Sequence, residues 1–178
     1  MNSKGFCSSG LCTGNLLSIP FTDNSVDLVY TCHSIEPNGG NEESILAELY
    51  RVCRKYLILF EPAYEFADDK VKKRMRDHGY CRGLADYAKK LGFKVIEHAL
   101  FHVTTNPMNP TAVTVIEKGT QGEFSGSVFA CPRHKTPLKR FENGFFSPEA
   151  LVVYPIIMGI PCLRIENGIL ASHLETFI

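Results

Sequence analysis

The pattern of apolar and polar positions predicts a strand, a helix and a second strand in the first third of the chain. Residues 25–31 are β-branched, aromatic and polar in a short run, which is typical of a strand. In residues 41–55, apolar side chains recur on one face at helical spacing, with acidic residues in the first turn and basic ones in the last. Residues 56–60 are continuously apolar, so we expect a strand buried on both sides, as in a parallel sheet. This order predicts a right-handed crossover unit.

Two more helices and two more strands follow in the pattern. Residues 68–78 are heavily charged with two apolar anchors, and residues 82–91 carry an apolar face that ends at a glycine. Residues 93–103 and 111–117 predict strands, and the short loop of Asn and Pro between them suits an antiparallel pair. The predicted fold class of this part is therefore α/β.

The composition changes after residue 118. Residues 119–126 are rich in glycine and small polar side chains, which is typical of a linker, and the remainder is rich in proline with short β-like runs. We therefore expect two domains, 1–122 and 123–178, of which the second is small and β-rich.

Composition and charge exclude several classes of protein. With 44% hydrophobic and 21% charged residues, the chain of 178 residues is not disordered throughout. Nineteen basic residues balance nineteen acidic ones, so no basic excess favours a nucleic-acid partner. The longest apolar run, residues 150–163, is broken by proline and glycine and is too short for a membrane span. Seven cysteines without a Cys-x-x-Cys pair, and no apolar leader, predict a reducing, cytoplasmic location.

Three segments carry motifs in a recognisable order. They are residues 14–21 (GNLLSIPF), residues 23–30 (DNSVDLVY) and residues 48–52 (ELYRV), with Glu61-Pro62 closing the strand that follows. In this order and spacing, the first 118 residues resemble the C-terminal half of a class I S-adenosylmethionine-dependent methyltransferase of the small-molecule type. The resemblance implies a partial Rossmann-like sheet, its fourth to seventh strands with their helices, the cofactor S-adenosylmethionine and a small-molecule acceptor.

The chain also departs from that family. The family's glycine-rich cofactor turn would come before residue 14 and is absent, and the usual Asp near the cofactor's adenine is Asn15. The resemblance therefore implies an N-terminally truncated domain. Three alternatives stay open: an active enzyme, an inactive scaffold or dimerisation module, and a fragment of a longer enzyme. The strand at 25–31 would have an open edge, which favours a homodimer or a partner chain.

Candidate catalytic residues follow the two predicted parallel strands. Ligands of open α/β sheets bind beyond the carboxyl ends of the strands, so the polar residues after each strand lie at one edge. A hydroxyl or amine that accepts a methyl group needs a proton acceptor, for which we select His33, Glu36 and Glu61. The alternatives are a loop histidine bonded to backbone, and carboxylates that cap helices or tether loops.

Four residues are candidate cofactor contacts. By the resemblance, Asn15 and Leu16 flank the adenine, and Thr31 and Cys32 lie at the end of the first predicted strand. The alternative for Asn15 and Leu16 is an ordinary exit from a strand into a turn.

The tail carries a second resemblance. Residues 131–138 and 154–161 (YPIIMGIP) are similar to the small zinc-ribbon-like family of methyltransferase activator proteins. Related proteins hold zinc with two Cys-x-x-Cys pairs, whereas here only Cys131 and His134 keep ligand spacing. Because a structural zinc site takes four ligands, we expect no metal site. We expect the tail domain to pack on the sheet or to cover its open edge.

Overall fold

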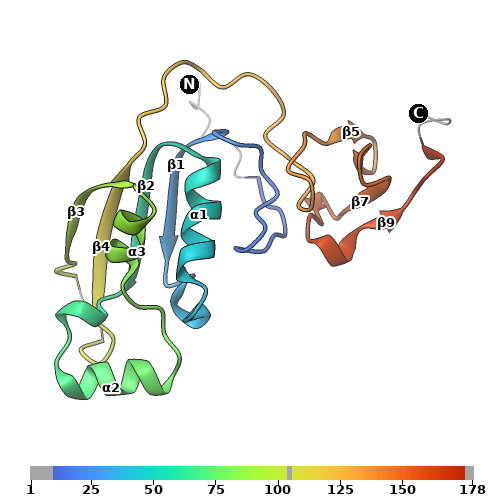
Figure 1. The fold of residues 1–178 in the computed structure, drawn as a ribbon. Helices are drawn as coiled ribbons and strands as arrows, with labels where there is room; N and C mark the ends of the chain where they lie inside the picture. Colours follow the sequence, from blue (N-terminus) through green and yellow to red (C-terminus); the bar gives the residue numbers. More distant parts are fainter. Residues whose placement is uncertain (1–9, 104–105, 175–178) are drawn as a thin grey trace, which may run out of the picture. The chain divides into compact units, whose positions relative to one another are not determined.

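The computed structural model describes residues 10–103 and 106–174, and the chain divides into two compact units (Figure 1). One unit is residues 23–126. The other combines the described parts of 1–22 and 127–178.

This division differs from the expected one at the N-terminus, where residues 10–22 group with the C-terminal segment. Backbone hydrogen bonds hold them there: the N–H of Thr13 donates to Pro161, and the N–H of Ala130 donates to Pro20, both at 2.9 Å. The rings of Phe21 and Phe129 also pack at 5.7 Å between centroids. Pairing with residues distant along the chain thus determines the unit to which residues 10–22 belong. The local sequence of this segment does not indicate that pairing.

A four-stranded sheet forms the centre of the unit 23–126. Its strands are β1 (Val26–Cys32), β2 (Cys53–Pro62), β3 (Lys94–Leu100) and β4 (Thr111–Glu117), in the spatial order β1-β2-β4-β3. β1 and β2 are parallel, whereas β4 is antiparallel to both β2 and β3. The predicted mixed α/β class, the parallel pair and the antiparallel pair are confirmed.

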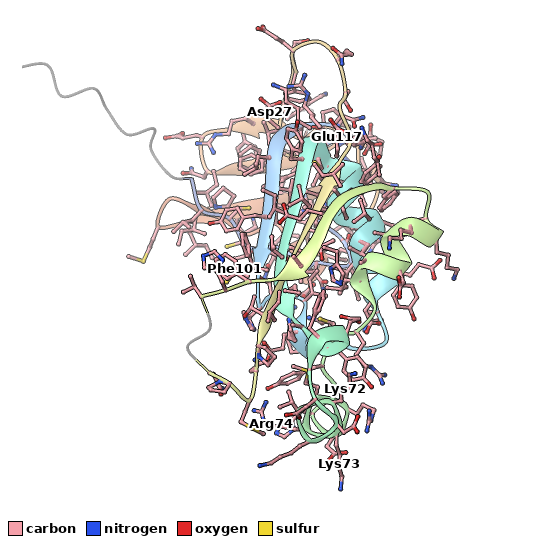
Figure 2. All side chains as sticks on the ribbon, turned by 90° about the vertical axis from the view of Figure 1, so that its left-hand side faces the viewer. Asp27, Lys72, Lys73, Arg74, Phe101 and Glu117 are labelled. Atoms are coloured by element: carbon pink, nitrogen blue, oxygen red, sulfur yellow. The ribbon has the colours of Figure 1, made fainter. Side chains whose placement is uncertain are left out.

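Three helices accompany the sheet: α1 (Glu42–Val52), α2 (Asp69–Asp77) and α3 (Leu84–Lys90). α1 contacts β1 and β2, α3 contacts β3 and β4, and the two helices contact each other, so both lie on the same face (Figure 1). α2 lies beyond the carboxyl end of β1 in Figure 1, and Figure 2 shows its side chains Lys72, Lys73 and Arg74. Short 3₁₀ turns, η1 (Glu36–Asn38) and η2 (Tyr64–Phe66), follow β1 and β2.

The junction of α1 and β2 lies earlier than predicted. The helix ends at Val52 and not at residue 55, because Cys53 is extended (φ −68°, ψ 143°) and already pairs with Val26 of β1. The guanidinium of Arg54 then bonds Asp27 at 2.6 Å. Strand pairing therefore overrides the helical pattern of the last three residues.

The prediction that this second strand is buried on both sides is wrong. Leu57 and Leu59 are fully buried, but Ile58 between them is half-buried and Tyr56 before them is 40% exposed. The alternation arises because the helices cover one face of the sheet only.

The second unit is built from short antiparallel strands around a small core. In this core Tyr154 packs with four other buried side chains: Cys131, Leu138, Phe145 and Leu163. Its regular elements are β5 (Lys139–Phe141), β6 (Gly144–Ser147), β7 (Val152–Ile157), β8 (Ile160–Pro161), η3 (Ile165–Asn167) and β9 (Ile169–Leu170).

Candidate functional site

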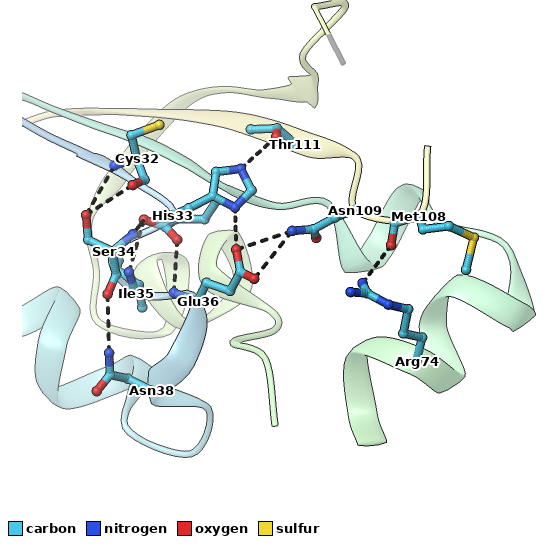
Figure 3. A network of polar contacts seen from close by, with 11 residues as sticks. Cys32, His33, Ser34, Ile35, Glu36, Asn38, Arg74, Met108, Asn109 and Thr111 are labelled. Carbon is cyan, nitrogen blue, oxygen red and sulfur yellow. Dashed lines mark hydrogen bonds and ion pairs between the residues drawn. The ribbon is translucent and has the colours of Figure 1, made fainter. Parts of the chain in front are cut away.

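His33 lies at the carboxyl edge of the sheet, directly after β1. Its backbone has a positive φ of 48° and its N–H donates to the carbonyl of Phe60 at 2.9 Å. Its Nδ1 pairs with the carboxylate of Glu36, and its Nε2 lies 2.9 Å from the hydroxyl of Thr111 (Figure 3). Both ring nitrogens are therefore held, by groups from two different segments, while 32% of the side chain stays exposed.

Glu36 is the group that orients this imidazole. The amide of Asn109 donates to both of its carboxylate oxygens, at 3.4 and 3.3 Å. Partial burial raises the pKa of Glu36, but hydrogen bonds from His33, Tyr80 and Asn109 outweigh it, so that its pKa is lowered overall. An ionised carboxylate at Nδ1 favours the tautomer that carries its proton there, which leaves Nε2 as the basic nitrogen.

Glu61, at the end of β2, is hydrogen-bonded to the loop that carries His33 and Glu36. Its side chain is 2% exposed and accepts three backbone N–H groups, from Ser34 at 3.1 Å, Ile35 at 3.2 Å and Glu36 at 3.1 Å. Burial raises the pKa of Glu61 by more than these hydrogen bonds lower it. The geometry is that of a loop tether, one of the alternatives that the sequence leaves open for this residue.

Two residues of this network, Asn109 and Thr111, are missing from the sequence prediction. Asn109 lies in the loop before β4, and Thr111 is the first residue of β4. Because β4 is antiparallel to β2, Thr111 pairs with Pro62 at the carboxyl end of β2. Only a prediction that these two strands pair would have brought both residues to the site.

The four candidate cofactor contacts are divided between the two units. Thr31 is 4% exposed, whereas Cys32, on the opposite side of the strand, is exposed. In the other unit the carboxamide oxygen of Asn15 accepts a hydrogen bond from the N–H of Leu17 at 2.9 Å, and Leu16 is half-buried. The roles of these four residues as cofactor contacts stay predictions.

Comparison with known proteins points to one family. Residues 3–59, about a third of the chain, match the family described as Methyltransferase domain. This segment is similar to a methyltransferase. It contains His33 and Glu36.

Among solved structures, a SAM-dependent methyltransferase from Methanosarcina mazei is similar, with 17% sequence identity and a TM-score of 0.44. The likeness covers 60% of this chain and 66% of that chain, just under two thirds of that protein's length. A comparison with curated proteins finds no match.

Within 10–103 and 106–174, three His, Cys, Asp or Glu side chains nowhere gather to hold a metal ion. Cys131 is buried beside the hydroxyl of Tyr154, whereas His134 is exposed. Over the same ranges, none of the helices has the length and apolar character needed to cross a membrane.

Proposed function

We propose that this chain carries the acceptor side of an S-adenosylmethionine-dependent methyltransferase acting on a small-molecule acceptor. The observation that carries the proposal is the His33–Glu36 pair, which lies at the carboxyl edge of parallel strands and inside the segment similar to a methyltransferase domain. Ligands of open α/β sheets bind at this edge.

In this proposal His33 is the proton acceptor. A hydroxyl or amine that gains a methyl group must lose a proton, and an imidazole held near the nucleophile can take it. The hydroxyl of Thr111 lies against Nε2, so the acceptor's proton goes to the oxygen of Thr111 as this hydroxyl passes its own proton to Nε2. The ionised carboxylate of Glu36 stabilises the imidazolium that then forms. Glu61 positions the loop through its three backbone hydrogen bonds.

The cofactor is not assigned a binding set within this chain. Of the four predicted contacts, Cys32 is the one in the unit 23–126 that is exposed. We therefore assign to the residues of this unit only proton acceptance and positioning.

The test combines binding with turnover. The full chain is titrated calorimetrically with S-adenosylhomocysteine, and methyl transfer to a panel of small acceptors is measured for the chain and for His33→Asn. We expect binding in the micromolar range, unchanged in His33→Asn, and a loss of about 10²–10⁴-fold in transfer rate. His78→Asn is the matched control, since His78 is exposed and its ring bonds only the backbone carbonyl of Arg74 among the described residues. A folded chain that binds no S-adenosylhomocysteine overturns the proposal.

One observation favours a second candidate, a non-catalytic dimerisation module. β1 lies at the edge of the sheet and exposes Leu28 by 50% and Tyr30 by 66%. An open apolar edge strand invites pairing with another strand, and a second copy of this chain supplies an identical one. The solution mass distinguishes the two: a dimer that Tyr30→Lys converts to a monomer supports this candidate, and a monomeric chain excludes it.

A further inference from the structure

A cleft of about 600 Å³ opens beside the candidate site, within the unit 23–126. Its walls come from the start of α1, the 3₁₀ turn η2 after β2, helix α2, the segment that joins α2 to α3, and helix α3. The lining includes Tyr64, Lys72, Arg82 and Tyr87. This volume lies in the range of small-molecule sites, which is about 300–1,000 Å³.

Three cationic side chains converge on one aromatic ring in this cleft. The guanidinium of Arg76 donates to the hydroxyl of Tyr64 at 2.7 Å, and Arg82 and Lys72 lie 5.8 and 6.0 Å from the centre of the ring. The hydrogen bond from Arg76 is the main reason that the pKa of the Tyr64 phenol is lowered. None of the ion pairs formed within the described part of the chain involves these three cations.

Two of the three carboxylates that line the cleft are engaged by backbone. Glu42 accepts the N–H groups of Gly40 at 2.7 Å and Arg82 at 3.0 Å, one on each oxygen. Glu65 accepts the N–H of Gly83 at 2.6 Å. The third, Asp86, is 81% exposed and lies 4.0 Å from the ammonium of Lys89. Apart from Asp86, the side chains that remain to bind a ligand are cationic and aromatic.

The cleft is joined to the His33–Glu36 site through its own boundary. A second, smaller cavity, lined by Glu61, shares Arg82 and Gly83 with the cleft. The segment before Arg82 is bonded to the loop after β1, since the N–H of Cys81 donates to the carbonyl of Glu36 at 3.0 Å. A ligand in the cleft thus contacts Arg82 and Gly83, which directly follow the residue that is hydrogen-bonded to the backbone of Glu36.

We infer that this cleft binds a small planar acceptor through an anionic group, a carboxylate or a phosphate, held by Lys72 and Arg82. The guanidinium of Arg82 suits both anions, because its planar N–H groups pair with two oxygens at once. The rings of Tyr64 and Tyr87 provide the surface for the flat part of the ligand. The inference names the acceptor class and rests on the proposed function.

The test measures binding by the full chain without cofactor, so that it does not depend on S-adenosylmethionine. Benzoate, phenyl phosphate and the neutral benzamide are titrated separately and followed by amide chemical shifts in NMR. We expect benzoate or phenyl phosphate to bind and benzamide to bind at least tenfold more weakly, and which anion binds tighter identifies the group. Lys72→Gln and Arg82→Gln should each weaken the anion by about tenfold, about 1.4 kcal/mol.

Lys73→Gln is the matched control, because Lys73 is an exposed neighbour on the same helix and does not line the cleft. The fold of Arg82→Gln is expected to survive, since the bond to Glu42 comes from the backbone N–H of this residue. The inference is overturned if benzamide binds as tightly as the anions, if no probe binds, or if Lys72→Gln and Arg82→Gln bind the anions as tightly as the native chain does. If the chain binds the anions but not S-adenosylhomocysteine, the proposed function is overturned, whereas anion binding in the cleft is supported.

Discussion

The two faces of the sheet in the unit 23–126 are made from the same strands but have different environments. On the face toward α1 and α3, Leu57, Leu59 and Ile116 are fully buried. On the opposite face, Tyr30 is 66% and Tyr56 is 40% exposed. Both sets of side chains are apolar, so the difference does not come from their hydrophobicity. It comes from the connections, which place both helices on one side.

This comparison also explains where the candidate site forms. At the carboxyl edge the covered face ends in Glu61, whose side chain is buried and tethers the loop with His33 and Glu36. The covered face thus provides the rigid support. The uncovered face leaves an apolar surface that a second copy or a partner could bury.

The largest expected effect is on the covered face. Leu59→Ala should lower the free energy of unfolding by about 2–5 kcal/mol, because it leaves a cavity beneath the helices. Urea unfolding followed by far-UV circular dichroism measures it. A loss below about 1 kcal/mol contradicts the packing of α1 and α3 on this face.

The next largest effect on the free energy of unfolding is expected at Glu61, which tethers the loop after β1. Glu61→Gln keeps one acceptor oxygen for three backbone N–H groups, so we expect a loss of about 1–3 kcal/mol. Amide hydrogen exchange should quicken at Ser34 and Glu36. Glu97→Gln, at an exposed position of β3, is the control and should leave that exchange unchanged.

A smaller effect depends on pH. Because the folded-state pKa of Glu36 is lowered, its contribution to stability is present above the ordinary value of 4.5 and is lost as the pH falls through the folded-state pKa. The thermal midpoint of the native chain should therefore exceed that of Glu36→Gln at pH 7, and the gap should close at acidic pH. A gap that persists at low pH assigns the effect to packing rather than to charge.

The smallest expected effect is on the uncovered face. Tyr30→Ser should change the free energy of unfolding by no more than about 0.5 kcal/mol, since its side chain is largely exposed. The same urea titration measures it at low protein concentration. A loss comparable to that of Leu59→Ala shows that another surface covers this face in solution.

The site was predictable in part. The polar residues that follow two apolar parallel strands pointed to His33, Glu36 and Glu61, and the structure brings these three together. Their catalytic roles stay predictions. Asn109 and Thr111 could not be found, because nothing local marks β4 as the neighbour of β2.

By itself, the sequence determined the elements whose signals are local. The apolar spacing of α1 and the apolar run of β2 are properties of neighbouring residues, which is why these elements were predicted with errors of a few residues at their ends. Only the tertiary structure decided what depends on distant partners. It joined residues 10–22 to the C-terminal segment and left one apolar face of the sheet without helices. It also directed a strand from beyond residue 110 to complete the surroundings of His33. Hydrogen bonds and burial between segments far apart in the chain settle these choices, and no local pattern records them.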